Sequence, residues 1–319
     1  MNGAHPPYSV IADCLKEQTV VPFLGAAASA AGAPENQALP MGSQLARILA
    51  NRNDYPRRNV EPPDPLSKVA EFVAGASADR RRLIDIIHTV FYSDLPQDYH
   101  CSLTDFLAAA PEKAIPRLFI STNYDCLVER ALEHRSIPFL AISQVSRRQR
   151  LSGRFLCYTS LNQNEPELLT RDQLKTRLGA CPLLGALETA TNDSPRVIVY
   201  KMHGTTFLNE AASEGSIVVT ESDYVTFLAD NTLQSMPAII LDALVRGRIL
   251  FLGYSLSDWN FRVLLQRVRR LQEGSSMANW AVLRHTDEIE KEFWLRRGVR
   301  LYEMALEEFL MELQSKLAS

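Results

Sequence analysis

The chain has 319 residues, enough for one large α/β domain, and its 34 basic residues stand against 37 acidic ones. This near balance excludes a charge excess that would require nucleic acid or an anionic membrane as partner, although basic clusters at 80–82, 147–150 and 267–270 leave a nucleic-acid contact open. The longest apolar runs, near Ile239 and Ile249, are too short to span a bilayer and no signal peptide is recognisable, so we expect a cytoplasmic protein with no membrane partner.

The five cysteines are far apart and include no CxxC pair. This spacing is unlike that of a zinc ribbon or a disulfide framework, so we expect no bound metal and a reducing compartment. The cysteines are Cys14, Cys101, Cys126, Cys157 and Cys181.

Short runs rich in β-branched and aromatic residues predict buried strands at 19–24, 117–122, 196–201, 248–254 and 280–283. Apolar residues recur between them at helical spacing. Examples are Leu83, Ile87, Val90 and Phe91, and Phe261, Leu264, Leu265 and Val268. The alternation predicts an α/β domain whose Rossmann-like, mostly parallel sheet has helices on both faces.

Two regions depart from this alternation. From about residue 36 to 116, helical segments interrupted by the Pro-rich stretch EPPDPL predict a helical layer over the front of the sheet. From about 146 to 195 the chain is polar and without clear periodicity, which predicts an insertion or small subdomain. We expect residues 1–319 to form a single domain.

Ligands of parallel sheets bind beyond the carboxyl ends of the strands, and the first predicted strand runs into VPFLGAAASAAGAP. Small residues around Gly25, Ser29 and Gly32 let a backbone approach a pyrophosphate closely. Tight packing between a strand and a helix explains the same residues, because the stretch is neither GxGxxG nor a Walker loop. Alone, this loop favours packing.

The second strand end, in LFISTNYDCLVERAL, carries Ser121, Thr122, Asn123 and Asp125 before an amphipathic helix. Asp125 could cap that helix while Asn123 stabilises a turn. Alternatively, these polar side chains converge on a ligand. The residues themselves leave both interpretations open.

Two further strands end in small or polar residues. RVIVYKMHGTTF places His203 where a histidine is suited to general base catalysis, although a lone histidine is often structural. RILFLGYSLSDWNFRVLL places Gly253 and Ser255 before a helix that Ser257 or Asp258 caps. Four such strand ends together favour a nucleotide site.

In this order the four motifs resemble the sirtuin superfamily, most closely its bacterial SIR2-like branch in antiphage defence. The loop resembles GAGxSxxxGxP, with Ala27 in place of the middle glycine, and VVTESDYVTFL resembles a TxxDY segment of that branch. The remaining matches are TNYD at 122–125, where Thr122 replaces a Gln, HG at 203–204 and GxSLxD at 253–258.

The resemblance implies that Asn123 and His203 are catalytic and that Asp125 faces the nicotinamide carboxamide of NAD. It also implies that the strand end at Arg284 approaches the adenine. The implied NAD-binding residues are Gly25, Ala26, Ser29, Gly32, Pro34, Thr122, Gly253 and Ser255.

Because sirtuin deacylases carry a four-cysteine zinc ribbon and this sequence has none, the resemblance favours an NAD glycohydrolase (NADase) that yields nicotinamide and ADP-ribose without a metal. It further implies an antiphage effector controlled by a partner or by assembly, namely a homo-oligomer accompanied by a HerA-type ring ATPase. Two alternatives remain: an NAD-dependent protein deacylase or ADP-ribosyltransferase, and a non-catalytic nucleotide-binding scaffold that acts with a partner or on nucleic acid.

Overall fold

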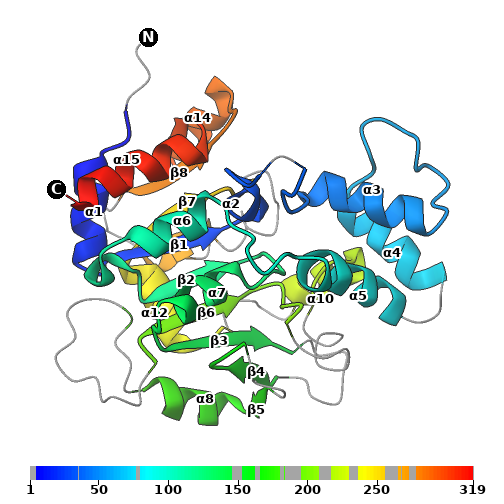
Figure 1. Ribbon diagram of the computed structural model, residues 1–319, viewed down its shortest axis with the longest axis horizontal. Helices are drawn as coiled ribbons and strands as arrows, with labels where there is room; N and C mark the ends of the chain where they lie inside the picture. Colours follow the sequence, from blue (N-terminus) through cyan, green and yellow to red (C-terminus); the bar gives the residue numbers. More distant parts are fainter. Residues whose placement is uncertain are drawn as a thin grey trace.

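A nine-stranded sheet forms the centre of the computed structural model, in the order β5-β4-β3-β6-β2-β1-β7-β8-β9 (Figure 1). The structure describes residues 5–34, 36–76, 80–145, 153–161, 166–179, 183, 195–207, 217–229, 236–255, 265–266, 268–272 and 278–318. The strands are β1 (Val20–Leu24), β2 (Leu118–Ser121), β3 (Phe139–Gln144), β4 (Phe155–Tyr158), β5 (Glu167–Leu169), β6 (Val197–Lys201), β7 (Arg248–Leu252), β8 (Asn279–Leu283) and β9 (Val299–Glu303).

The sheet is mostly parallel, as predicted. Every pairing from β3 through β9 in this order is parallel. At the edge beyond β3, the pairs β3–β4 and β4–β5 are antiparallel, so β4 alone is reversed. The five predicted strands correspond to β1, β2, β6, β7 and β8. The strands β3, β4, β5 and β9 were not predicted. Within the segment 146–195, the described residues extend the sheet by β4 and β5.

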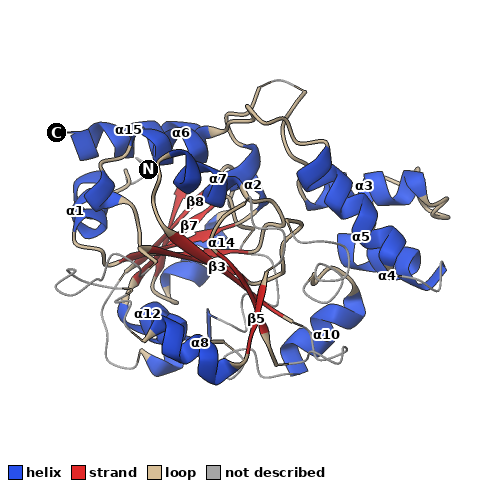
Figure 2. Ribbon diagram, turned by 60° about the horizontal axis from the view of Figure 1, so that its bottom comes forward, coloured by secondary structure: helices blue, strands red, loops and turns tan. Residues whose placement is uncertain are grey.

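Helices cover both faces of the sheet (Figure 2). On one side lie α15, α6 and α1, and on the other lie α12 and α8. The helices are α1 (Tyr8–Lys16), α2 (Ala26–Ala30), α3 (Gly42–Arg52), α4 (Leu66–Ala76), α5 (Arg81–His88), the π-helical η1 (Thr89–Ser93), α6 (Ser102–Ala109), the 3-10 η2 (Glu112–Ala114), α7 (Leu127–His134), α8 (Arg171–Leu178), α10 (Glu221–Ala229), α12 (Ala238–Arg246), α14 (Glu288–Leu295) and α15 (Leu306–Ala318).

Strand β1 shows why the apolar runs are continuous. All five of its residues are buried, with Val20 and Leu24 in the core on one face and Val21 and Phe23 in the core on the other. A strand covered on both faces cannot alternate apolar with polar residues. The regular elements described in the region 36–116 are all helices, as predicted, and α3, α4 and α5 form a group beside the sheet (Figure 1).

The loop after β1 crosses the turn after β7 backbone to backbone. The N–H of Gly25 donates to the Leu252 carbonyl at 3.0 Å, and the N–H of Ala27 donates to the Gly253 carbonyl at 3.1 Å. A Cβ on Gly25 would lie 2.5 Å from Tyr254 Cα, and one on Gly253 would lie 2.1 Å from Ala28 N. Both glycines are therefore required by packing, whatever ligand binds.

Gly253→Ala should destabilise the protein more than Gly153→Ala. Both glycines have left-handed backbones, with φ of +61° and +77°, but a Cβ on Gly153 meets nothing within 4 Å. The left-handed conformation costs each variant roughly 1–2 kcal/mol. Overpacking against α2 adds roughly 1–3 kcal/mol for Gly253→Ala. Urea unfolding measures both losses, and equal losses would contradict the close crossing.

Candidate functional site

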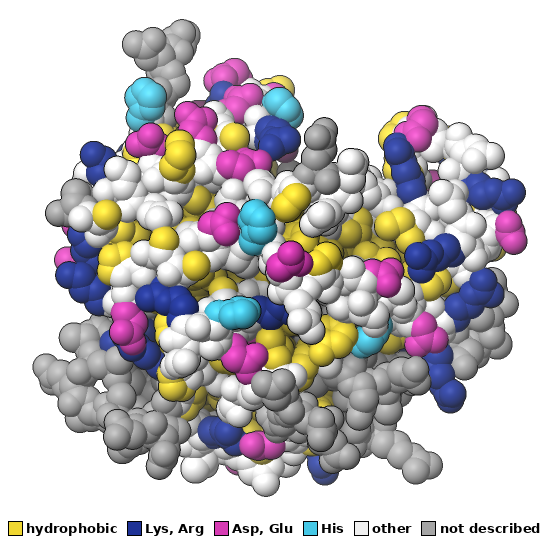
Figure 3. Space-filling view, viewed as in Figure 1, with side chains coloured by type: hydrophobic (Ala, Val, Ile, Leu, Met, Phe, Trp, Pro, Cys, Tyr) yellow, Lys and Arg dark blue, Asp and Glu magenta, His cyan; other side chains and the backbone are white. Residues whose placement is uncertain are grey.

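A cavity of about 880 Å³ lies at the carboxyl ends of five neighbouring parallel strands, β6, β2, β1, β7 and β8. Residues that follow each of these strands line it. Adjacent strands lie about 4.8 Å apart, so the lined edge is roughly 19 Å long. The volume falls in the range of small-molecule sites, and the length suits an extended ligand. Figure 3 shows hydrophobic side chains on this face between α2 and the group α3–α5.

The cavity brings together most of the residues that the sequence predicted for a site. Gly25 and Pro34 do not line it, and Gly25 instead packs under the loop against Tyr254. The predicted residues that do line it are Ala26, Ser29, Gly32, Thr122, Asn123, Asp125, His203, Gly253 and Ser255. Arg284 also lines it. Their roles remain predictions.

Asn123 joins the turn after β2 to the loop after β1. It is buried, and its Nδ2 donates to the Gly25 carbonyl at 2.9 Å and to Ser29 Oγ at 2.8 Å. A carbonyl can only accept, which fixes the orientation of the amide. Within the described part of the chain no hydrogen bond uses Oδ1 of Asn123, so that oxygen is the atom available to a water or hydroxyl in the cavity.

The two carboxyl oxygens of Asp125 have different surroundings. Its Oδ1 accepts a hydrogen bond from the Leu127 N–H at 3.1 Å, which stabilises the turn before α7, although the N-cap position itself is Cys126. Its Oδ2 is buried and has no hydrogen-bond partner among the described residues. An unsatisfied buried polar atom costs roughly 1–3 kcal/mol. The carboxyl group therefore lacks a donor that a ligand can supply.

The rest of the loop is held by hydrogen bonds within the protein. The Ala28 N–H donates to the Gly25 carbonyl at 2.9 Å, and Thr122 Oγ1 donates to the Leu24 carbonyl at 3.1 Å. Ala27 lies in α2 with a helical backbone, so its methyl group is accommodated without a left-handed φ. Since the N–H groups of Ala27 and Ala28 are already used, this loop offers a pyrophosphate fewer donors than its motif predicts.

Tyr99 stabilises the loop after β1 through hydrogen bonds to backbone groups. Its hydroxyl donates to the Ser29 carbonyl at 2.6 Å and accepts from the Leu39 N–H at 3.2 Å. Burial raises the pKa of Tyr99 to about 12, so the phenol stays a neutral donor at physiological pH. Sequence analysis missed this residue, which no motif marks.

His203 is buried beside the cavity, where its ring packs edge-on against two aromatic residues of α10. The ring centroids are 5.5 Å from Tyr224 and 5.7 Å from Phe227. The predicted TxxDY segment therefore supplies an aromatic wall that fixes the imidazole.

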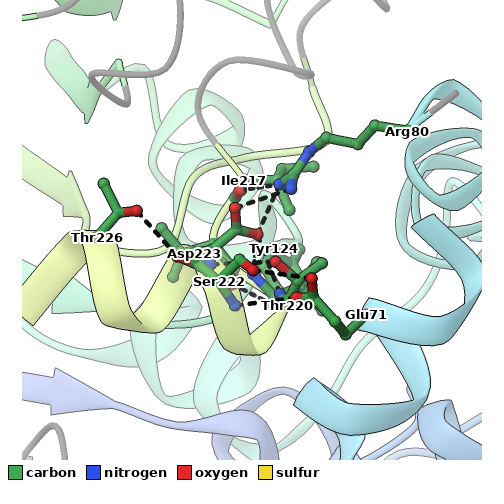
Figure 4. A network of polar contacts seen from close by, with 10 residues as sticks. Glu71, Arg80, Tyr124, Ile217, Thr220, Ser222, Asp223 and Thr226 are labelled. Carbon is green, nitrogen blue, oxygen red and sulfur yellow. Dashed lines mark hydrogen bonds and ion pairs between the residues drawn. The ribbon is translucent and has the colours of Figure 1, made fainter. Parts of the chain in front are cut away.

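The start of α10 explains the rest of that segment. Thr220 and Asp223 form a reciprocal cap, in which the Thr220 N–H donates to Asp223 Oδ2 at 3.0 Å and the Asp223 N–H donates to Thr220 Oγ1 at 3.1 Å. From the helical layer, Arg80 donates to Asp223 Oδ1 at 2.8 Å, and Glu71 accepts from the Ser222 N–H at 2.9 Å (Figure 4). The helical layer thus holds the helix that supports His203.

A buried ion pair anchors the turn that carries Asp125. Lys201 Nζ donates to the Asp125 carbonyl and lies 3.6 Å from Glu129 Oε1, which also accepts from the Tyr158 hydroxyl at 2.9 Å. Lys201 and Glu129 are 2% and 0% exposed, so neither charge could remain there without its partner. Sequence analysis missed both residues.

Among the described residues no group of three or more His, Cys, Asp or Glu side chains is arranged to hold a metal ion. No helix in the described ranges has the length and apolar character needed to cross a membrane. Four of the cysteines are buried free thiols. Cys181, residues 147–150, 256–264 and Arg267 lie outside the described residues, and with them the predicted caps Ser257 and Asp258.

Asp223→Asn should lower the free energy of unfolding at pH 7 by roughly 1–3 kcal/mol, because Arg80 loses its charged acceptor. Burial raises the pKa of the Asp223 carboxyl, but the hydrogen bond and charge of Arg80 and the neighbouring N–H groups outweigh it and leave the pKa lowered. A lowered folded-state pKa stabilises the fold above the unfolded-state value of about 3.9, and this stabilisation is lost as the pH falls further.

Urea unfolding between pH 7 and pH 3 checks this expectation. The difference between the parent protein and Asp223→Asn should shrink below about pH 4. Asp242→Asn is the matched control, because its ion pair with Arg246 is exposed and contributes about 1 kcal/mol at most. A difference that stays constant down to pH 3 would exclude the stated cause.

The chain is similar to proteins of one family. A relative from Bacillus subtilis, Defense-associated sirtuin 2, is 25% identical over 126 residues, which are 39% of this chain and only 12% of that protein. A solved structure described under the mechanism and regulation of Sir2 enzymes is 11% identical, covers 99% of this chain and 98% of that one, and has a TM-score of 0.43. The sequence pattern of the SIR2-like domain matches residues 117–302, more than half of the chain, so the protein belongs to the SIR2-like domain family.

Proposed function

We propose that the protein is an NAD glycohydrolase that cleaves NAD into nicotinamide and ADP-ribose. The observation that carries the proposal is the buried, unpartnered Oδ2 of Asp125, in a cavity that Asn123 and His203 also line. Membership of the SIR2-like family, whose members commonly consume NAD, supports it.

The order of the strands suggests how the dinucleotide lies. Asp125 and His203 follow β2 and β6 on one side of β1, whereas β7 and β8 lie on its other side. The nicotinamide ribose would therefore lie over β2 and β6, the pyrophosphate over the small residues Ala26 and Ala27, and the adenosine over β7 and β8. This direction follows from the placement of Asp125 at the carboxamide.

In this pose each polar side chain has a chemical task. Breaking the bond between C1′ and the nicotinamide nitrogen develops positive charge on the ribose. Asp125 Oδ2 accepts a hydrogen bond from the carboxamide NH₂ and orients the leaving group. Asn123 Oδ1 accepts from the attacking water, and His203 takes the proton as the water oxygen bonds to C1′. Nicotinamide leaves as a neutral molecule with the electron pair of the broken bond.

The relative's name, Defense-associated sirtuin 2, supports a role in defence for this chain, which we propose is defence against phages. Because uncontrolled NAD loss would kill the cell, the proposal includes control by assembly or by a separate partner such as a HerA-type ring ATPase. The contacts of Arg80 and Glu71 with α10 offer such control a physical route to His203.

Asn123→Ala and His203→Ala should each slow nicotinamide release by roughly 10²- to 10⁴-fold, the range of general acid–base catalysis. Free nicotinamide is measured with NAD alone, without an acylated peptide, so the assay counts hydrolysis and not deacylation. His134→Ala is the matched control, because His134 is exposed at the end of α7 and does not line the cavity. If both folded variants released nicotinamide at the parental rate, the mechanism would be wrong.

Asp125→Asn separates a catalytic role from a purely structural one. Asparagine keeps the acceptor for the Leu127 N–H, so the free energy of unfolding should change by no more than about 1 kcal/mol. Nicotinamide release should nevertheless fall by roughly 100-fold, because the carboxylate acceptor for the carboxamide is gone. Thermal unfolding of the variant is measured beside its activity. Full activity would show that Asp125 only stabilises the turn before α7 and has no catalytic role.

A further inference from the structure

Glu307 of α15 reaches the cavity from outside the four motifs and outside the matched domain. Its Oε1 accepts a hydrogen bond from the Gly32 N–H at 3.1 Å and lies 3.3 Å from Arg284 Nη2. Both Glu307 and Arg284 line the cavity. A carboxyl group and a guanidinium therefore meet beside the predicted dinucleotide loop, on the side of β8.

The second oxygen of this carboxyl group is unsatisfied. Oε2 of Glu307 is buried and has no hydrogen-bond partner in the described ranges, although the side chain as a whole is 33% exposed. Buried polar atoms nearly always have a partner, so an unpartnered one beside a cavity indicates a missing donor. Met304 and Leu306, which also line the cavity, offer no side-chain donor.

The missing donor has to be uncharged or positively charged. A phosphate group carries negative charge and offers only acceptors, so it is repelled by Glu307, whereas a hydroxyl group donates readily to a carboxylate. In the pose given above the adenosine lies over β7 and β8. The hydroxyl donors of adenosine nearest to Glu307 in this pose are the 2′- and 3′-hydroxyl groups of its ribose.

From this geometry we infer that Glu307 selects NAD over NADP by binding the 2′-hydroxyl of the adenosine ribose and excluding a 2′-phosphate. The inference rests on the proposed function for the position of the adenosine. It agrees with a general rule of dinucleotide sites, in which an acidic side chain holds the ribose 2′-hydroxyl and a nearby arginine accommodates a 2′-phosphate.

The ion pair of Arg284 with Glu307 bears on how a 2′-phosphate would be received. The side chain of Arg284 is 69% exposed and pairs with Glu307, so the cation that could receive a 2′-phosphate is already neutralised. Removing the charge of Glu307 would release Arg284 toward the ligand. A single substitution, Glu307→Gln, should therefore weaken the preference for the unphosphorylated dinucleotide and create an attraction for the phosphorylated one.

The test is equilibrium binding of ADP-ribose and of 2′-phospho-ADP-ribose, measured by calorimetry. Neither compound contains the bond to nicotinamide, so binding is measured independently of hydrolysis. The parent protein should prefer ADP-ribose at least tenfold, since a hydrogen bond to a charged group contributes roughly 1.5–3 kcal/mol. Glu307→Gln should bring the two affinities within about threefold of each other.

Glu308→Gln is the matched control, because Glu308 is the exposed neighbour on α15, carries the same charge and does not line the cavity. It should keep the parental preference. If Glu307→Gln did not fold, Arg284→Gln would decide. Removal of the cation leaves the carboxylate of Glu307 without its counter-charge, so the preference for ADP-ribose should rise, and an unchanged or lower preference would overturn the inference.

Three further results would overturn the inference: a parent protein without a preference, Glu307→Gln with the full parental preference, or a loss of preference in Glu308→Gln as large as in Glu307→Gln. If the parent protein bound neither compound and consumed no NAD, both the proposed function and the inference about Glu307 would fail. If NAD were cleaved while Glu307→Gln kept the parental preference, only the inference about Glu307 would fail.

Discussion

The hydrogen bonds of the Asn123 amide hold the candidate site together. Through Gly25 and Ser29 they fasten the turn after β2 to the loop after β1, and the crossing of that loop with Gly253 fastens its other side to β7. Three strand ends are thereby fixed relative to one another. The cavity and every role proposed for its side chains depend on this fixed geometry, since catalytic groups act only when held in place.

The two parts of the site rest on different supports. The buried ion pair of Lys201 and Glu129 stabilises the turn that carries Asp125. The ring of His203 packs against α10, and α10 is bonded to the helical layer through Arg80 and Glu71. The first support is enclosed in the core. The hydrogen bonds of Arg80 and Glu71 join the helical layer to α10 and involve partly exposed side chains. A partner that binds the helical layer could therefore alter this support of His203.

The sequence predicted the five strands in which a continuous apolar run is bounded by polar turns. It missed β3, which is buried but whose sequence FLAISQ contains a single β-branched residue. It also missed β9, which is partly exposed at the sheet edge, and β4 and β5, which follow a polar segment on the opposite edge. Such strands depend on pairing with a neighbour that local sequence does not reveal. For the same reason the sequence could not place the segment 146–195.

The site residues also divide into those that local sequence marks and those that depend on distant contacts. Asn123, Asp125, His203 and Gly253 lie at the ends of predicted strands, and the resemblance to sirtuin motifs marked them as site residues. All four line the cavity. The role of Glu307 depends on Gly32, 275 residues away, and nothing in the sequence around it marks a site. Ala27 departs from the family motif, which has a glycine at this position. Its backbone is helical and its N–H is used by Gly253, so its methyl group fits the fold.

In the proposed complex, one dinucleotide spans the five strand ends with its nicotinamide at Asp125. The most direct measurement is a crystal structure of the protein with carba-NAD, in which a carbon atom replaces the ring oxygen of the nicotinamide ribose and prevents cleavage. The carboxamide NH₂ should lie within hydrogen-bond distance of Asp125 Oδ2, and the pyrophosphate should lie over Ala26 and Ala27. A ligand in the reverse direction, or one that leaves Asp125 Oδ2 without a donor, would contradict this arrangement.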